Sequence, residues 1–317
     1  MNGTRSAKLR GARKRTLWET LLRDFKMNKY KYLLVLPVLV VLAFFSYKPM
    51  YGLIIAFKNF RPRLGIAGSK WVGWQNFIHY TQDPFFFRLF RNTLSISSLS
   101  ILFGFPLPIV LALSLNEVKY RPFKRTVQTM TYMPYFISMV VASALVRVYT
   151  QSNGMFADLI VAFGGMRQNI LSNPRYFYAI YVISDIWQFV GWNSIIYLAA
   201  LSSIDQEQYE AARIDGAGRL KQALHVTLPG LMPTITVLFI LRMGGILNVG
   251  FEKIILLYSE ATYQVADVIS SYVYRRGIIQ TDYSYATAVG LFNSVINVMF
   301  LVIANSLSRR YGDSALF

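Results

Sequence analysis

The stretch from Asp205 to Pro233 reads DQEQYEAARIDGAGRLKQALHVTLPGLMP, and it connects two long apolar segments. Asp205 is suited to cap a helix, and the residues after it, acidic at first and then rich in alanine, predict a short helix. Gly216 and Gly218 predict its end, and the prolines at 229 and 233 are expected to set the angle of entry into the next segment. The stretch therefore predicts a small rigid knob, thin enough on its alanine surface to enter a groove of a partner.

Apolar residues dominate the rest of the chain. Of its 317 residues 54% are hydrophobic and 15% are charged, against about 25% charged in soluble proteins. A helix needs about 20 mostly apolar residues to cross a bilayer. Six segments fit this length, at residues 32–57, 92–115, 132–149, 177–201, 233–257 and 286–307. The chain is expected to be an all-α, multi-pass integral membrane protein with about six transmembrane helices.

Basic residues in the connections predict the orientation. The N-terminal arm, the connection at residues 119–125 and the tail with Arg309 and Arg310 are basic, and six spans place all three on the cytoplasmic side. Both termini are therefore expected in the cytoplasm, and the chain in the cytoplasmic (inner) membrane. The first connection is an exception. It is predicted to be extracytoplasmic, yet its basic residues (Lys58, Arg61, Arg63, Lys70 and Arg88) are opposed by Asp83 alone.

The formal net charge of +18 raises the question of nucleic-acid binding. The basic side chains of the first 31 residues are Arg5, Lys8, Arg10, Arg13, Lys14, Arg15, Arg23, Lys26, Lys29 and Lys31. An apolar segment follows at once, so the arm is interpreted as a juxtamembrane segment drawn to anionic lipid headgroups, with no nucleic-acid partner.

Several chemistries are excluded by the residues that are missing. Cysteine is absent, and His79 and His225 are the two histidines, so neither a thiolate nor a histidine metal site is expected. No Gly-x-x-x-x-Gly-Lys-Ser/Thr sequence occurs, and no nucleophile stands at a suitable spacing from a base. The chain is expected to have no catalytic residues and to bind no ATP itself.

The knob resembles the EAA loop of MetI-like permeases of bacterial ABC importers. The resemblance rests on Glu210-Ala211-Ala212, Asp215-Gly216-Ala217 and Leu228-Pro229. Further segments resemble the carbohydrate-uptake branch of this family, and within it the LplB-like permeases for oligosaccharides and polysaccharide fragments. These segments are residues 51–58, 71–77, 91–94, 250–252 and 285–292.

The resemblance implies the type I ABC importer permease fold and a set of partners. These are an ABC ATPase dimer that binds ATP and magnesium and receives the EAA loop, a second permease that we expect to differ in sequence, and an extracytoplasmic sugar-binding protein. It also implies transport by alternating access. The domains would be a basic arm (1–31), a first transmembrane helix (32–57), an extracytoplasmic loop (58–87), a permease core (88–308) with the coupling loop (202–233), and a cytoplasmic tail (309–317).

Polar residues inside the apolar segments are candidates for the substrate pathway, because such residues face a bundle interior or a wet cavity. The candidates are Asp185, Gln188, Trp192, Asn193, Arg242, Asn248, Glu252, Asn293 and Asn297. Aromatic faces and amide or carboxylate groups suit sugar rings, although packing and interhelical hydrogen bonds account for such residues equally well. Asp185 and Arg242 fall at similar depth, which raises the possibility of an ion pair.

Two further hypotheses concern the substrate and the energy source. Arg147 is expected to reach the membrane interface. Together with the basic first connection, it also raises the hypothesis of an anionic substrate such as a uronate oligomer. The alternative to an ATP-driven importer is a proton- or ion-coupled secondary sugar carrier that uses Asp185.

Overall fold

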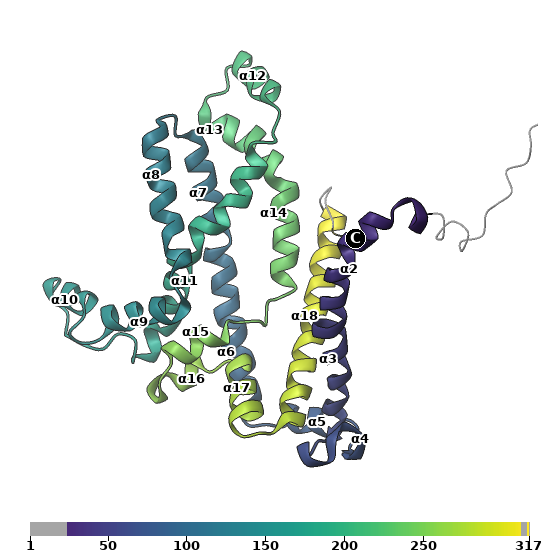
Figure 1. Cartoon of the computed structure of the whole chain (residues 1–317). Helices are drawn as coiled ribbons and strands as arrows, with labels where there is room; N and C mark the ends of the chain where they lie inside the picture. The colour runs from purple at the N-terminus through teal and green to yellow at the C-terminus, as the bar shows by residue number, and fades with distance from the viewer. Residues whose placement is uncertain (1–23, 312–315, 317) are drawn as a thin grey trace, which may run out of the picture. The chain divides into compact units, whose positions relative to one another are not determined.

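The computed structural model describes residues 24–311 and 316, and these residues are almost entirely helical (Figure 1). The basic arm up to Arg23 and most of the tail after Tyr311 lie outside the described residues. The chain divides into two compact units, residues 1–54 and 55–317.

The described part of the first unit is one long apolar helix. It passes through α2 (Lys29–Leu42), a π-helical turn η1 (Ala43–Tyr47) and α3 (Lys48–Met50), and it enters the 3₁₀ helix η2 (Tyr51–Phe57). Pro49 does not break this helix, because the π-helical turn before it carries the helix past the proline. Residues 29–57 are long and apolar enough to cross a membrane.

The second unit begins with a small folded hairpin. Strands β1 (Lys58–Asn59) and β2 (Lys70–Trp71) pair antiparallel around η3 (Pro62–Leu64) and α4 (Gly65–Gly68), and α5 (Gln75–Thr81) follows. Asn76 Nδ2 donates to the carbonyl oxygens of Ala56 and Lys58 at 2.8 and 3.1 Å. These bonds hold the base of the hairpin closed.

The remaining helices form the bundle of Figure 1. In chain order they are α6 (Phe86–Leu99), η4 (Ser100–Gly104), α7 (Pro106–Glu117), α8 (Arg121–Tyr132), η5 (Met133–Phe136), α9 (Met139–Thr150), α10 (Met155–Ala162), α11 (Pro174–Leu201), α12 (Gln206–Ile214), α13 (Arg219–Gln222), η6 (Ala223–Thr227), α14 (Leu228–Met243), α15 (Phe251–Leu257), η7 (Glu260–Thr262), α16 (Tyr263–Ala266), α17 (Ile269–Tyr274), η8 (Arg275–Ile279) and α18 (Tyr283–Tyr311).

Prolines explain where π-helical turns interrupt the long α-helices. Three π-helical turns, η1, η4 and η6, each end two residues before a proline, at Pro49, Pro106 and Pro229. Proline has no N–H to donate four residues back, and its ring collides with that carbonyl. A π turn accommodates the mismatch and keeps the helix continuous.

The prediction of one straight span at residues 132–149 is wrong. The chain there consists of two helical segments, Arg121–Phe136 and Met139–Ala162, that meet at 102°. Pro134 lies in the 3₁₀ turn that ends the first segment, and the Ser138 hydroxyl accepts a hydrogen bond from the Val141 N–H to start α9. The break therefore lies between a proline-containing turn and a capped helix start.

The expected span at residues 233–257 is also wrong in its bounds. Its helix runs from Arg219 to Met243 and then ends, and α15 is a separate short helix after residues 244–250.

Four helices among the described residues are long and apolar enough to span a membrane, or five if the bent pair counts as one. The prediction was about six. The remaining expected span corresponds to α11, which has 28 residues and a length of about 42 Å. Its polar and aromatic residues make it less apolar than the other four.

Hydrophobic clusters place α11 at the centre of the second unit. One cluster joins Phe177 and Tyr181 of α11 to α15 and α16, through residues such as Ile254 and Ala266. Another joins Tyr197 and neighbouring residues of α11 to α7 and α14. Because α11 is packed on several sides, its remaining polar face is directed into a cavity.

Candidate functional site: a membrane cavity and a projecting knob

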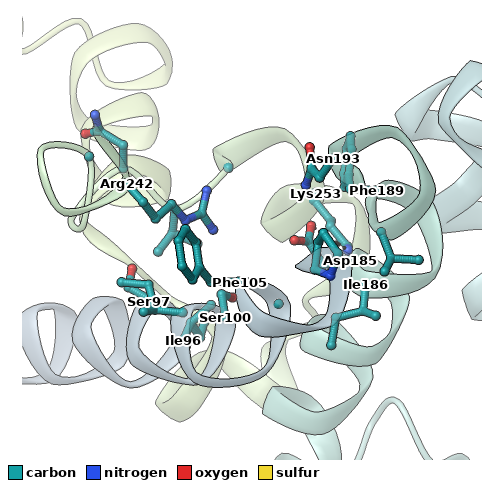
Figure 2. A pocket seen from close by; sticks show the side chains of 18 of the residues that line it. Ile96, Ser97, Ser100, Phe105, Asp185, Ile186, Phe189, Asn193, Arg242 and Lys253 are labelled. Atoms are coloured by element: carbon teal, nitrogen blue, oxygen red, sulfur yellow. Dashed lines mark hydrogen bonds and ion pairs between the residues drawn. The ribbon is translucent and has the colours of Figure 1, made fainter. Parts of the chain in front are cut away.

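A cavity of about 740 Å³ lies between α6, α7, α11, α14 and residues 245–253 (Figure 2). This volume is within the range of about 300–1,000 Å³ that small-molecule sites occupy. Six of the nine predicted pathway residues line it, namely Asp185, Trp192, Asn193, Arg242, Asn248 and Glu252. Ser97, Ser100 and Tyr181 add hydroxyl groups to the wall, and Phe105 and Phe189 add aromatic surface.

Asp185 is paired with a residue that was not among the sequence candidates. Lys253 Nζ lies 3.2 Å from Asp185 Oδ1 and donates to the Tyr181 carbonyl oxygen at 3.2 Å. The suggested Asp185–Arg242 ion pair is therefore wrong. A single helix over residues 233–257, as the sequence predicts, does not bring Lys253 to Asp185, whereas the break after Met243 turns α15 back against α11.

Arg242 keeps its charge available to the cavity. It stands in the last turn of α14, and Figure 2 shows its side chain directed into the cavity, apart from the Asp185–Lys253 pair. Among the described residues, no carboxylate lies within ion-pair distance of Arg242. Glu252 is the other cavity-lining charge that those ion pairs do not include. The cavity therefore presents one unpaired cation and one unpaired anion.

The predicted amide residues mostly hold the cavity wall together. Gln188 is buried and donates to the Ile137 carbonyl oxygen at 3.1 Å. Asn297 is buried, and its Oδ1 accepts from the Leu247 N–H at 3.0 Å. Asn293 and Asn297 both donate to Asn248 Oδ1, at 3.2 and 3.0 Å. The contacts of Asn293 and Asn297 join α18 to the irregular segment after α14. The hydrogen bonds of Gln188 and Asn297 support the packing interpretation for these two residues.

Trp192 combines packing with exposure to the cavity. Its ring stacks on Tyr135 with centroids 4.1 Å apart and planes 2° from parallel. It still lines the cavity together with Asn193, the next residue of α11. The pair offers an aromatic surface and an amide at neighbouring positions.

Arg147, which is expected to reach the membrane interface, is exposed and also binds two backbone carbonyl groups. Its Nε donates to the Leu256 carbonyl oxygen, and its Nη2 donates to that of Tyr258 at 3.4 Å. It therefore caps the carboxyl end of α15, where a cation is favoured by the helix dipole.

The predicted knob is present as α12 and lies beyond the ends of α7, α8 and α14 (Figure 1). Asp205 Oδ1 accepts from the Glu207 N–H at 3.0 Å, as the N-cap prediction requires. Glu210, Ala211 and Asp215 are exposed. The knob thus offers a small exposed surface, on which the apolar side chains of Ile214 and Leu220 also lie.

Gly216 ends α12 in a left-handed conformation, with φ of 76°. The Ala217 N–H donates to the Ala212 carbonyl oxygen at 2.9 Å, and the Gly216 N–H donates to that of Arg213 at 3.0 Å. This pair of bonds is a Schellman motif, which needs a residue that tolerates positive φ. Gly216 is therefore required by the backbone.

The knob is tied to the base of the next long helix. Tyr209 Oη donates to Thr227 Oγ1 at 3.1 Å, and Gln222 Nε2 donates to the Ala217 carbonyl oxygen at 2.6 Å. Leu228 and Pro229 belong to the first turn of α14 rather than to the knob. These hydrogen bonds connect α12 and the residues after it to the segment that leads into α14.

No group of three or more possible metal ligands occurs within residues 24–311.

The chain is similar to known membrane transport proteins. Residues 104–313 match the family described as "Binding-protein-dependent transport system inner membrane component". The chain is 43% identical to the polygalacturonan/rhamnogalacturonan transport system permease protein YteP of Bacillus subtilis (strain 168), over 94% of this chain and 93% of the relative. It is 44% identical to Protein LplB of the same organism, over 92% of each chain.

Two solved structures resemble the fold. One is a bacterial ABC transporter involved in the import of the acidic polysaccharide alginate, with a TM-score of 0.84 and 43% identity over 92% of this chain and 99% of that chain. The other is a bacterial alginate ABC transporter in complex with an alginate pentasaccharide-bound periplasmic protein. Its TM-score is 0.84 at 42% identity, over 95% of this chain and 99% of that chain.

Proposed function

Because the chain belongs to the family of binding-protein-dependent transport system inner membrane components, and is an oligosaccharide permease subunit of an ABC importer, we propose that it conducts acidic oligosaccharides through the cavity between α11 and α14. The observation that carries this proposal is Arg242, an unpaired cation inside a polar, aromatic cavity. A uronate carboxylate is planar and matches a guanidinium in two parallel hydrogen bonds. Two proteins that are 43% identical to this chain belong to a polygalacturonan/rhamnogalacturonan transport system and to an alginate importer, which supports the same substrate class.

The comparisons support the importer and not the secondary carrier considered from the sequence. Asp185, on which the carrier depended, is engaged with Lys253.

The proposed mechanism divides the work between subunits. An ATPase dimer binds ATP and magnesium and closes on α12, with Glu210, Ala211, Ala212, Asp215, Gly216 and Ala217 as the contact surface. The movement passes through Tyr209 and Thr227 to α14, of which Leu228 and Pro229 form the first turn. Because ATP binds one state more tightly than the other, the cavity opens to the two sides of the membrane in turn.

Two further partners complete the assembly. A second permease, of different sequence, would close the pathway, and an extracytoplasmic binding protein would deliver the sugar, as the alginate transporter complex suggests. In this arrangement α12, both termini and the connection between α7 and α8 face the cytoplasm. That placement agrees with the basic residues of the two termini and of the connection between α7 and α8.

The substrate class is tested by uptake into vesicles that carry the whole transporter. A uronate trisaccharide is compared with its methyl ester, which has the same rings without the charge. Arg242→Gln is expected to lower uptake of the free acid about ten-fold or more, since a hydrogen bond between charged groups contributes about 1.5–3 kcal/mol. Glu252→Gln, which removes the opposite charge, should leave that uptake unchanged or raise it. Equal loss of acid and ester uptake in Arg242→Gln would contradict the assignment.

The partners are tested by co-purification in mild detergent. Wild type should retain an ATPase and a second permease, and a variant carrying Glu210→Lys and Ala212→Asp should lose the ATPase alone. Recovery of the ATPase with this variant would contradict the assignment of α12 as its contact.

A further inference from the structure

The hairpin at residues 58–82 has a charge that the proposed pathway does not explain. It contains Lys58, Arg61, Arg63 and Lys70 and no Asp or Glu. Within the second unit it lies at the opposite end of the bundle from α12, beside the start of α18 (Figure 1). If α12 faces the cytoplasm, this basic segment is extracytoplasmic, against the usual distribution of Lys and Arg in membrane proteins. This excess of basic residues on the extracytoplasmic side suggests that they bind a ligand there.

Two tryptophans of this hairpin form an exposed aromatic surface. Phe57 stacks with Trp71 at 5.7 Å between centroids and contacts Trp74 edge-on at 5.2 Å. Phe77 closes the cluster against Trp74 at 5.1 Å. Trp71 is nevertheless 57% exposed and Trp74 65% exposed. One side of each ring is therefore packed and the other is open.

Cations surround this surface. In the register of the two strands Lys58 lies directly opposite Trp71, and Lys70 lies opposite Asn59. Opposed residues of an antiparallel pair share a face, so Lys58 and Trp71 are neighbours on one side. Arg61, Arg63 and Lys70 are exposed, and none has an acidic partner among the described residues.

The surface is held rigidly before any ligand arrives. Lys58 Nζ donates to the Ile66 carbonyl oxygen at 2.7 Å, and Ser69 Oγ bridges the Arg61 N–H and the Gly65 carbonyl oxygen. The Phe60 N–H donates to Ser284 Oγ at 2.7 Å, which fixes the hairpin to α18. A preformed surface loses little conformational entropy on binding.

We propose that this hairpin is a separate binding site for acidic oligosaccharides, on the outer face of the permease. The inference rests on the proposed function, since it takes the same substrate class. Sugar rings present C–H groups on their faces, and an aromatic ring presents its negative face to them. The surrounding Lys and Arg would attract uronate carboxylates and raise their local concentration at the pathway entrance. The exposed rings of Trp71 and Trp74 suit the faces of sugar rings, and the hairpin cations, which have no acidic partner among the described residues, suit carboxylates.

The test is a binding measurement that needs no transport. Tryptophan fluorescence of the purified whole transporter, without its binding protein, is titrated with a uronate trisaccharide and with its methyl ester. The free acid should change the fluorescence and the ester should bind at least ten-fold more weakly. The response should weaken at high salt, which screens exposed charges. Because no turnover is involved, a negative result here leaves the uptake test of the permease function standing.

Variants assign the response to the hairpin. A Trp71→Phe and Trp74→Phe variant should lose the fluorescence change, and an Arg61→Gln, Arg63→Gln and Lys70→Gln variant should bind at least ten-fold more weakly. The matched control removes three charges at the other end of the bundle, as Lys119→Gln, Arg121→Gln and Lys124→Gln, and should bind like wild type.

Three results would overturn the proposal. The first is an unchanged fluorescence response in the Trp71→Phe and Trp74→Phe variant. The second is quenching of these two tryptophans by brominated lipids, which would place the rings in the bilayer. The third is loss of binding-protein association in the charge variant with oligosaccharide binding intact, which would make the hairpin a protein-docking surface.

Discussion

Lys253 Nζ lies 3.2 Å from Asp185 Oδ1. Lys253 is 3% exposed, while Asp185 borders the cavity. The two partners are therefore unequally solvated. If the carboxylate is removed, the buried ammonium keeps the Tyr181 carbonyl oxygen but has no compensating charge, whereas the carboxylate is the more exposed of the two groups.

This asymmetry predicts unequal effects of the two single substitutions. Asp185→Asn should destabilise the protein by about 3 kcal/mol, the low end for breaking a buried pair, because it leaves the charge of Lys253 uncompensated. Lys253→Met should lower the stability of the protein by less than Asp185→Asn does. The midpoint of thermal unfolding of the detergent-solubilised complex measures both. The double variant should regain stability relative to Asp185→Asn, and strictly additive losses would contradict the coupling.

Gly216 predicts a local and selective defect in the knob. Its φ of 76° is unfavourable for any residue with a Cβ, by about 1–2 kcal/mol. Gly216→Ala should fray the end of α12, and Gly216→Pro, with its fixed negative φ, should remove the Schellman motif. ATP hydrolysis should then be uncoupled from uptake, while the protein still inserts into the membrane.

A neighbouring glycine supplies the control for this prediction. Gly218 has an ordinary φ of −69°, and the space that an alanine methyl group would occupy there is open, so Gly218→Ala should behave as wild type. Normal uptake by Gly216→Pro would contradict a role of the knob in coupling.

The hydrogen bond of Tyr209 predicts that its removal weakens the coupling of ATP hydrolysis to uptake without loss of ATPase binding. Tyr209→Phe removes the hydrogen bond to Thr227, worth about 1 kcal/mol, and leaves the exposed surface of α12 unchanged. The ATPase should still co-purify, while fewer sugars are taken up for each ATP hydrolysed. Tyr120→Phe, at an exposed position outside the knob, is the control. Loss of the ATPase from Tyr209→Phe would place this residue in the docking surface instead.

The contrast between α12 and the cavity explains what the sequence could predict. The helix start at Asp205 and its end at Gly216 depend on local capping rules, and the structure has both. The ion pair of Asp185 depends on where the chain turns after Met243, and helical periodicity carried past that point assigned the wrong partner. Likewise, Pro134 gave no sign that α8 and α9 would meet at 102°, since membrane helices often contain proline without a break.

The hydrogen bonds of Asp83, just after the hairpin, predict that the stability of the fold decreases at acidic pH. Its carboxylate accepts hydrogen bonds from Tyr272 and Tyr285, the latter at 2.8 Å, and from the Phe85 N–H at 2.8 Å. Burial raises the pKa of Asp83, but these hydrogen bonds outweigh it, so the pKa lies below its usual value. A carboxyl with a lowered pKa in the folded state stabilises the fold above its unfolded pKa of about 3.9, and this contribution is lost as the pH falls through the lower folded pKa.

The thermal midpoint should therefore show no contribution from Asp83 to any change between pH 7 and pH 5, and should fall below about pH 4. Asp83→Asn should be less stable at pH 7 and should show a smaller decline below pH 4, since it has no carboxylate to protonate. Tyr285→Phe, which removes one donor, should fall between the two. If Asp83→Asn and wild type declined in parallel, the acid sensitivity would arise from other carboxylates, and the contact of Asp83 with α17 and α18 would contribute no pH-dependent stability.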